Sequence, residues 1–274
     1  MDNSAERRLR PPVWQLPNLL SLDAPVVALV WQGFLARESG LPLRLAGRAV
    51  LALTVWAIYL GDRLLDARDP SAACETARHA FSRRHARPLW LLTGIVLLLD
   101  FLLVCLELRP AVFRNGLWPL AAVLLYLATL HSRRLRIPKE LIIAILFTAG
   151  TFLIAWTASP DPWHQLGPPA AAFFGLCLLN LLAIERWEAR ELESRAGRDA
   201  HPATAWFNRY WFAWAMALLA LCCLRSRAAG PSRWFQAVGL SAAAMVAICL
   251  PERRLPMEVR RTLIDLVLLT PLLF

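Results

Sequence analysis

The chain has 274 residues and a formal net charge of +10, and 58% of its residues are hydrophobic whereas only 18% are charged. Soluble domains are about 45–50% apolar, so this composition, with a mean hydropathy of +0.46, excludes a water-soluble globule, a disordered chain and a coiled coil. Its basic residues fall between apolar runs rather than on one basic helical face, which argues against a nucleic-acid-binding protein. The composition therefore favours a polytopic membrane protein.

Nine apolar runs approach the length of about 20 residues that an α-helix needs to cross a bilayer. In chain order they cover residues 18–36, 46–65, 88–107, 117–131, 139–157, 168–185, 206–224, 234–250 and 260–274. Proline residues fall mostly in the gaps between these runs, as expected of a helix breaker. We therefore predict an all-α protein, a bundle of about nine transmembrane helices that forms one domain over residues 1–274. Residues 1–17 are predicted to be a cytoplasmic N-terminal segment, and 66–87 and 186–205 to be cytoplasmic polar loops.

Basic residues are distributed unequally between alternate loops. With the N-terminus inside, the cytoplasmic segments hold 22 of the 30 Lys and Arg residues and the outer segments hold 8. Cytoplasmic loops of membrane proteins carry an excess of these residues. The distribution therefore predicts a multi-pass protein of a bacterial inner (plasma) membrane, with a cytoplasmic N-terminus and a C-terminus outside.

The end of the second predicted helix carries three aspartates, Asp62, Asp66 and Asp69. At about 100° per residue they lie at roughly 0°, 40° and −20°, in one narrow stripe. Carboxylates on one helix face repel one another, and partial desolvation near a membrane strengthens that repulsion. Such a stripe requires compensation, either by arginine partners or by a divalent metal ion.

The end of the sixth predicted helix carries a second polar group on one side of the helix. Its members are Asn180, Glu185, Glu188 and Glu191. They lie at roughly 0°, 140°, 80° and 20° around the helix axis. Both clusters are predicted to end at the cytoplasmic face, where they could share a cation, and hard oxygen ligands of this kind suit Mg²⁺. Ion pairs with neighbouring arginines are the simpler interpretation of either cluster alone.

Between the two clusters lies the basic segment HSRRLRIPKE, which contains Arg133, Arg134 and Lys139. Juxtamembrane cations commonly attract anionic lipid headgroups. Beside two acidic clusters the same residues are candidates to bind a diphosphate, because Arg offers a planar fork to phosphate oxygens and Lys a point charge. Trp56 and Tyr59 precede Asp62 on one side of the second helix, where they pack in the core or present aromatic faces to a cationic intermediate.

Three more acidic residues, Asp23, Asp100 and Asp265, lie inside predicted helices. An ionisable residue at bilayer depth is a functional hypothesis because it is costly to place there. Asp23 and Asp265 are near helix ends, so we expect them at the membrane interface or paired with arginine. Asp100 is near the middle of its run and is expected to face protein or a cavity. A secondary transporter with Asp100 as its coupling site is therefore one alternative function.

The layout resembles the UbiA superfamily of intramembrane prenyltransferases, which have nine helices and acidic motifs at the cytoplasmic ends of helices two and six. DRLLD at 62–66 is similar to the DRxxD core of the family's first motif, NDxxDxxxD. HSRRLRIPKELIIAILFTAG at 131–150 resembles the family's basic pair, proline and apolar run ending in glycine. The sequence departs from the family at Ile58 and Tyr59, which stand where the motif has Asn and Asp, and in using Glu rather than Asp in the second cluster.

The resemblance implies an enzyme that uses Mg²⁺ to transfer a prenyl group from a prenyl diphosphate to an electron-rich, lipophilic and aromatic acceptor, with membrane lipid around it. The catalytic, metal-binding residues it implies are Asp62, Asp66, Glu185 and Glu188. Further implied metal ligands are Asp69, Asn180 and Glu191. Arg133, Arg134 and Lys139 are implied to hold the diphosphate, and Trp56 and Tyr59 to line the pocket. The departure at Ile58 favours an alternative, a catalytically degenerate UbiA-like membrane protein that binds isoprenoid lipid or acts as an assembly partner.

Overall fold

The computed structural model describes residues 16–67, 77–129, 138–196, 205–206, 209–227, 232–250 and 257–274 of the chain. Within these ranges all regular elements are helical, which confirms the predicted all-α class for the described residues. The elements are α2 (Leu16–Leu19), α3 (Asp23–Glu38), α4 (Leu45–Asp66), α5 (Ala77–Arg84), α6 (Ala86–Glu107), α7 (Pro110–Thr129), α8 (Lys139–Ala158), α9 (Pro162–Ala196), α11 (Trp211–Ser226), α12 (Ser232–Cys249), α13 (Met257–Val267) and the 3₁₀ helix η2 (Thr270–Leu273).

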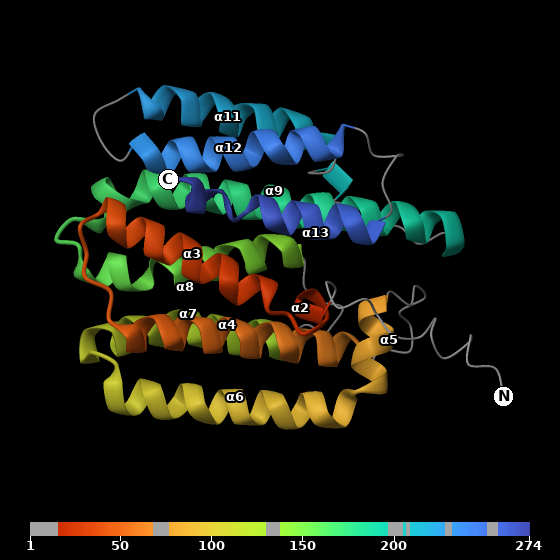
Figure 1. The fold of residues 1–274 in the computed structure, drawn as a ribbon, viewed down its shortest axis with the longest axis horizontal. Helices are drawn as coiled ribbons and strands as arrows, with labels where there is room; N and C mark the ends of the chain where they lie inside the picture. The colour runs from red at the N-terminus through yellow and green to blue at the C-terminus, as the bar shows by residue number, and fades with distance from the viewer. Residues whose placement is uncertain are drawn as a thin grey trace.

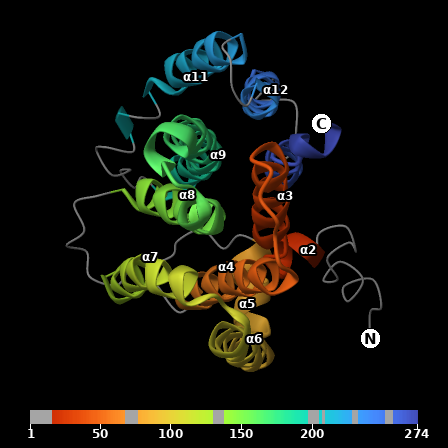
Figure 2. The same ribbon diagram turned by 90° about the vertical axis from the view of Figure 1, so that its left-hand side faces the viewer.

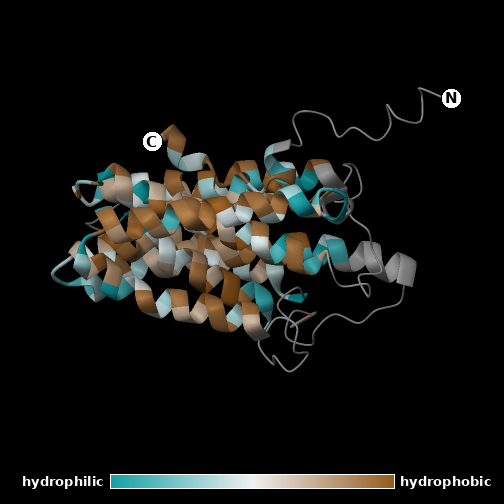
Figure 3. Cartoon of the chain, turned by 90° about the horizontal axis from the view of Figure 1, so that it is seen from below, coloured by the Kyte–Doolittle hydropathy of each residue, from teal (hydrophilic) through white to brown (hydrophobic). Residues whose placement is uncertain are grey.

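Five of the described helices are long and apolar enough to cross a membrane. They cover Leu45–Asp66, Ala86–Glu107, Pro110–Ala128, Lys139–Ala158 and Pro162–Glu188. α11 and α12 are also apolar but shorter. Hydrophobic residues occupy the middle of the bundle, and hydrophilic residues gather toward its two ends (Figure 3). Large apolar side chains such as Phe101 on α6 and Trp118 on α7 are exposed on the outside, as expected of a surface that faces lipid.

The long helices lie side by side along the long axis of the molecule (Figure 1). α9 packs against α8, α11 and α12, whereas α3 packs against α4, α8 and α12 (Figure 2). α6 lies at the edge of the bundle, where it packs mainly on α4. Consequently α3, α4, α8, α9 and α13 approach one another at the end of the bundle where α4 ends and α8 and α13 begin (Figure 1).

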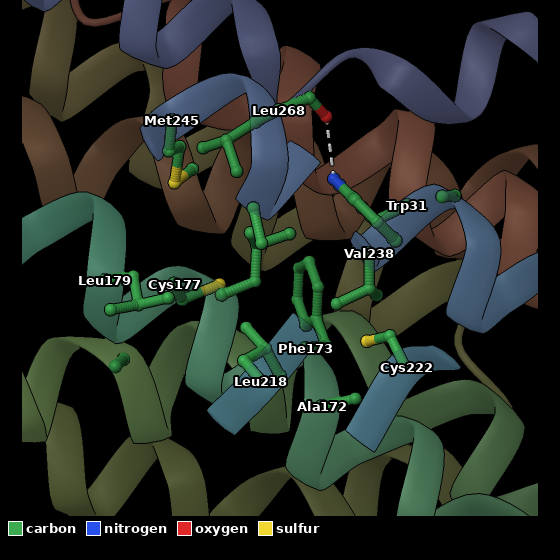
Figure 4. Close-up of a cluster of buried hydrophobic side chains, with 14 of the residues drawn as sticks. Trp31, Ala172, Phe173, Cys177, Leu179, Leu218, Cys222, Val238, Met245 and Leu268 are labelled. Atoms are coloured by element: carbon green, nitrogen blue, oxygen red, sulfur yellow. Dashed lines mark hydrogen bonds between the residues drawn. The ribbon is translucent and has the colours of Figure 1, made fainter. Parts of the chain in front are cut away.

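An aromatic core joins α3, α9 and α12 deeper in the bundle (Figure 4). The Trp31 side chain is fully buried, and its ring centroid lies 4.9 Å from that of Phe173 and 5.0 Å from that of Trp234. Its indole Nε1 donates a hydrogen bond of 2.8 Å to the carbonyl oxygen of Leu268. This bond fastens the C-terminal segment to α3, because Leu268 directly follows α13.

The first predicted helix, 18–36, is interrupted, and α3 begins only at Asp23. Ser21 has a φ of 57°, a left-handed conformation that is uncommon for residues other than glycine. The indole Nε1 of Trp56 donates a 2.8 Å hydrogen bond to the carbonyl oxygen of Leu20 and holds this turn against α4. The sequence did not predict this break, because the segment is mostly apolar and the break depends on a contact with another helix.

The fourth predicted helix, 117–131, is displaced in the structure. α7 begins at Pro110 and includes Arg114 and Asn115, whose polarity had interrupted the apolar run. The side-chain amide of Asn115 donates a 3.1 Å hydrogen bond to the hydroxyl of Thr157 on α8. Because α8 satisfies this polar group, the helix includes it.

The predicted cytoplasmic loops contain helical structure. α5 lies inside the segment 66–87, and α9 continues through the first part of 186–205 to Ala196. Glutamate and arginine are good helix formers, so a charged segment can extend a helix beyond the apolar run. The ninth predicted helix, 260–274, is divided into α13, which ends at Val267, and η2.

The bond between Trp31 and Leu268 predicts a specific loss of stability. In Trp31→Phe the carbonyl of Leu268 loses this donor inside the core, and the expected cost is about 1–3 kcal/mol. Thermal melting in detergent micelles measures it as a lower Tm. Trp163, which is 75% exposed, provides the matched Trp163→Phe control, and an equal shift in both variants would contradict the prediction.

Candidate functional site

A cavity of about 240 Å³ lies where α3, α4, α8, α9 and α13 meet. Most of its charged lining residues are acidic. Among the described residues seven carboxylates line it, Asp23, Asp62, Asp66, Glu140, Glu185, Glu188 and Asp265. The cations that line it are Arg63, Lys139 and Arg261. Because like charges repel strongly where water is partly excluded, this arrangement requires compensating contacts.

Residues of both predicted acidic clusters line this one cavity. Asp62 and Asp66 come from the end of α4, and Asn180, Glu185 and Glu188 come from α9. The spacing of three or four residues within each helix turns these side chains to a common side. Two groups that are more than 100 residues apart in sequence are thereby brought together.

Several other predicted site residues cannot be placed at the cavity. Asp69, Arg133 and Arg134 lie outside the described residues, and Glu191 is on α9 with its side chain outside the described part. Trp56 is not among the cavity's lining residues, because its indole group is directed to the turn before α3.

Tyr59 does line the cavity, one turn before Asp62. Its phenol group lies within electrostatic reach of Asp62, Asp23 and Asp265. The hydroxyl of Tyr126 on α7 donates a 3.4 Å hydrogen bond to Oδ1 of Asp62. Two phenols therefore accompany the α4 carboxylates, one inside the cavity and one behind it.

Arg63 holds the turn that precedes α3. Its guanidinium group donates hydrogen bonds to the carbonyl oxygens of Asn18 and, at 3.3 Å, of Leu19. Those carbonyls lie at the C-terminal end of α2, where a cation is favourable. The contact fixes the direction in which α3 starts and thereby places Asp23 at the cavity.

Asp23 and Asp265 approach each other across the cavity wall. The side-chain amide of Asn18 donates to Oδ2 of Asp23 at 3.0 Å and to Oδ2 of Asp265 at 3.5 Å. The second oxygen of Asp23 is buried and has no hydrogen-bond partner among the described residues. The sequence did contain a signal for this pair: both residues begin predicted helices on the side where the acidic clusters end.

Contacts with α13 involve two of the predicted metal ligands. Glu188 forms an ion pair with the buried side chain of Arg261. The amide of Asn180 donates to the carbonyl oxygen of Ile264 at 3.3 Å, a bond that does not use its side-chain oxygen. Next to the ion pair the guanidinium carbon of Arg260 lies 5.0 Å from the centroid of the Trp187 ring. These contacts attach α13 to α9.

Lys139 is the first residue of α8 and lines the cavity. A cation at a helix N-terminus is opposed by the helix dipole. The carboxylates that act on its ammonium group are Glu185, Asp66, Glu140 and Asp62. Lys139 therefore links the charges of α4, α8 and α9, and its position at the start of α8 is one at which the helix dipole favours an anion.

The described oxygen ligands do not form a closed metal site. Within the described residues no group of three or more His, Cys, Asp or Glu side chains lies close enough to hold a metal ion. Mg²⁺ typically binds through one or two carboxylates, with water and substrate phosphate in the other positions. Asp62 and Asp66 on one wall and Glu185 on another provide donors of that kind.

Asp100 lies away from the cavity, between α4 and α6. The hydroxyl of Thr54 donates a 2.7 Å hydrogen bond to its Oδ2. Its Oδ1 is buried and has no partner in the part of the chain that the structure describes. The residue faces protein, as its position in the apolar run predicts, but it does not line the cavity.

Comparison of the chain with models of known protein families, with curated proteins and with solved structures finds no match in any of the three. Function must therefore be inferred from the residues of the cavity.

Lys139 generates a prediction about stability. In Lys139→Gln the carboxylates of Glu185, Asp66, Glu140 and Asp62 lose a shared cation, so the Tm should fall below that of the wild type at low ionic strength. In high salt the charges are screened, and the difference in Tm should narrow. Thermal melting at both salt concentrations measures this, with exposed Arg48 on the same helix as Asp62 supplying the Arg48→Gln control. A difference that is unchanged or larger in high salt would show that Lys139 does not compensate the carboxylates.

Proposed function

We propose that the chain is a UbiA-type intramembrane prenyltransferase with nine transmembrane helices. It transfers a prenyl group from a prenyl diphosphate to an electron-rich aromatic acceptor, in a Mg²⁺-dependent reaction at the cytoplasmic side of a bacterial inner membrane. The observation that carries this proposal is the convergence of two acidic helix segments and Lys139 on one cavity. Such a cavity provides ligands for a metal ion and for a diphosphate at the same place.

In this proposal Asp62, Asp66 and Glu185 would hold Mg²⁺, which would neutralise charge on the diphosphate. Lys139 binds the diphosphate directly and stabilises the negative charge that develops as it leaves. The bond from the first prenyl carbon to the diphosphate oxygen breaks, a bond from that carbon to the acceptor ring forms, and the proton that the ring loses passes to the released diphosphate. Arg133 and Arg134, predicted from the sequence, would add cations at the same end.

The rest of the cavity suits the organic part of the reaction. Apolar side chains of Val27, Phe147 and Leu268 line it beside the charged groups. They exclude water from the carbon atoms, which protects an allylic cation from hydrolysis. The rings of Tyr59 and Phe147 also line the cavity, and aromatic faces attract cations.

A second candidate function is a catalytically degenerate relative that binds isoprenoid lipid without transferring it. Ile58 replaces the amide of the family's first motif. Glu188 is paired with Arg261, and no three metal-ligating side chains of the described residues are close together. Binding of a prenyl diphosphate without transfer is the result that favours this candidate.

Transfer of radiolabelled farnesyl diphosphate tests the proposal. Purified wild-type protein is incubated with an extract of membrane lipids as the source of acceptor, and the labelled product is followed by solvent extraction and chromatography. Mg²⁺ should be required, and Asp62→Asn and Asp66→Asn should each lower the rate by about a hundredfold or more. Asp161→Asn, an exposed acid between α8 and α9 at the opposite end of the bundle, should retain the rate. Transfer that survives both α4 substitutions would overturn the proposed site.

A further inference from the structure

Arg261 is an unusual cation for a cavity wall because it is almost completely buried. Its side chain is 2% exposed, whereas that of its partner Glu188 is 31% exposed. A buried charge must keep a partner, since leaving it uncompensated is strongly destabilising. Glu188 can leave the pair at lower cost because its side chain is partly exposed. The pair is therefore asymmetric: Arg261 requires an anion, but not this particular one.

The described cations of the cavity differ in their ability to bind a diphosphate. Arg63 is committed to the carbonyl oxygens that end α2. Lys139 is surrounded by carboxylates on α4, α8 and α9. Arg261 has a planar guanidinium group on the α13 wall, and such a group binds phosphate oxygens through two parallel hydrogen bonds. It is the guanidinium group whose partner Glu188 is an anion, as the incoming substrate is.

We propose that the Glu188–Arg261 ion pair is a lock that the substrate opens by exchange. A diphosphate replaces Glu188 as the partner of Arg261, and the released Glu188 becomes available to the divalent cation that accompanies the diphosphate. Arg261 stays paired throughout, and no covalent bond forms or breaks in the exchange. This inference rests on the proposed function, because it assigns to Arg261 a role in binding the same substrate.

The exchange couples the two ligands. Once Glu188 has left Arg261, its carboxylate is close to an anionic diphosphate and is repelled unless a cation lies between them. Binding of the diphosphate therefore increases the affinity for the divalent ion, and the converse must hold to the same extent. Until the diphosphate arrives, one of the predicted metal ligands remains occupied by an arginine.

α13 has other contacts that can keep it in place when the ion pair opens. The Asn180 amide bonds to the carbonyl of Ile264, and Arg260 lies over the ring of Trp187. Asp265 is attached to the other wall through Asn18. The exchange therefore needs only side-chain movement of Glu188 and not displacement of the helix.

Binding of inorganic pyrophosphate to the full-length protein, without divalent ions, tests the exchange. Isothermal titration calorimetry in detergent with EDTA compares the wild type with Glu188→Gln and Arg261→Gln. Glu188→Gln removes the competing anion, so the affinity should increase about tenfold, and Arg261→Gln should lower it about tenfold. The double variant should resemble Arg261→Gln, because the gain depends on the arginine. Asp161→Asn should bind as the wild type does.

The sign of the Glu188→Gln effect separates exchange from a purely structural ion pair. A structural pair predicts a lower Tm with unchanged or weaker pyrophosphate binding, and either result overturns the proposal, as does a failure of every variant to bind. If Arg261→Gln does not fold, the proposal is still tested by pyrophosphate binding to Arg261→Lys and by the increased affinity expected of Glu188→Gln. Loss of farnesyl transfer in Asp62→Asn with the pyrophosphate pattern intact supports the exchange, and absence of any transfer in the wild type overturns only the proposed function.

Discussion

Carboxylates gathered at one end of an apolar bundle are the constraint on which this structure depends. Their mutual repulsion is strong where water is partly excluded, and each contact that relieves it also joins two helices. Arg63 of α4 holds the turn before α3, and Lys139 joins α8 to the acids of α4 and α9. Asn18 bridges to α13, and Arg261 joins α13 to α9. The charges of the cavity thus determine how its walls are assembled.

The apolar core supports the same walls from the other side. Leu268 belongs to both regions, since its carbonyl oxygen accepts the bond from Trp31 and the residue also lines the cavity. Aromatic rings pack closely around Trp31 in the core. Close packing of this kind leaves neighbouring segments little room to move. The position of the segment after α13 therefore depends on the core, whereas the orientation of α13 toward α9 depends on several contacts, among them the ion pair and the hydrogen bond from Asn180 to Ile264.

The part of the site that could be predicted from the sequence is the part that follows from the helical period. It places Asp62 and Asp66 on one side of α4, and the structure has both at the cavity. Contacts between distant segments could not be read in this way, so the roles of Glu140 and Arg261 were missed. Trp56 illustrates the limit of this reasoning. It lies about two turns before Asp62 on α4, but its side chain is directed to the carbonyl of Leu20 in the turn before α3. The predicted start of a helix was wrong where a neighbouring helix satisfies a polar group, as α8 does for Asn115.

The balance of charges narrows what the cavity can hold. Among the described residues carboxylates outnumber cations at its walls, so an anion alone should bind less tightly than an anion that carries a cation with it. A divalent cation alone finds no three ligands together in the described part of the chain. A ligand that carries both an anion and a divalent cation avoids the repulsion and the shortage of metal ligands. Its anionic oxygens complete the coordination of the cation and also pair with Arg261 or Lys139. The proposed substrate, a metal-bound prenyl diphosphate, has this composition, and its hydrocarbon tail would lie against the apolar side chains that line the remainder of the cavity.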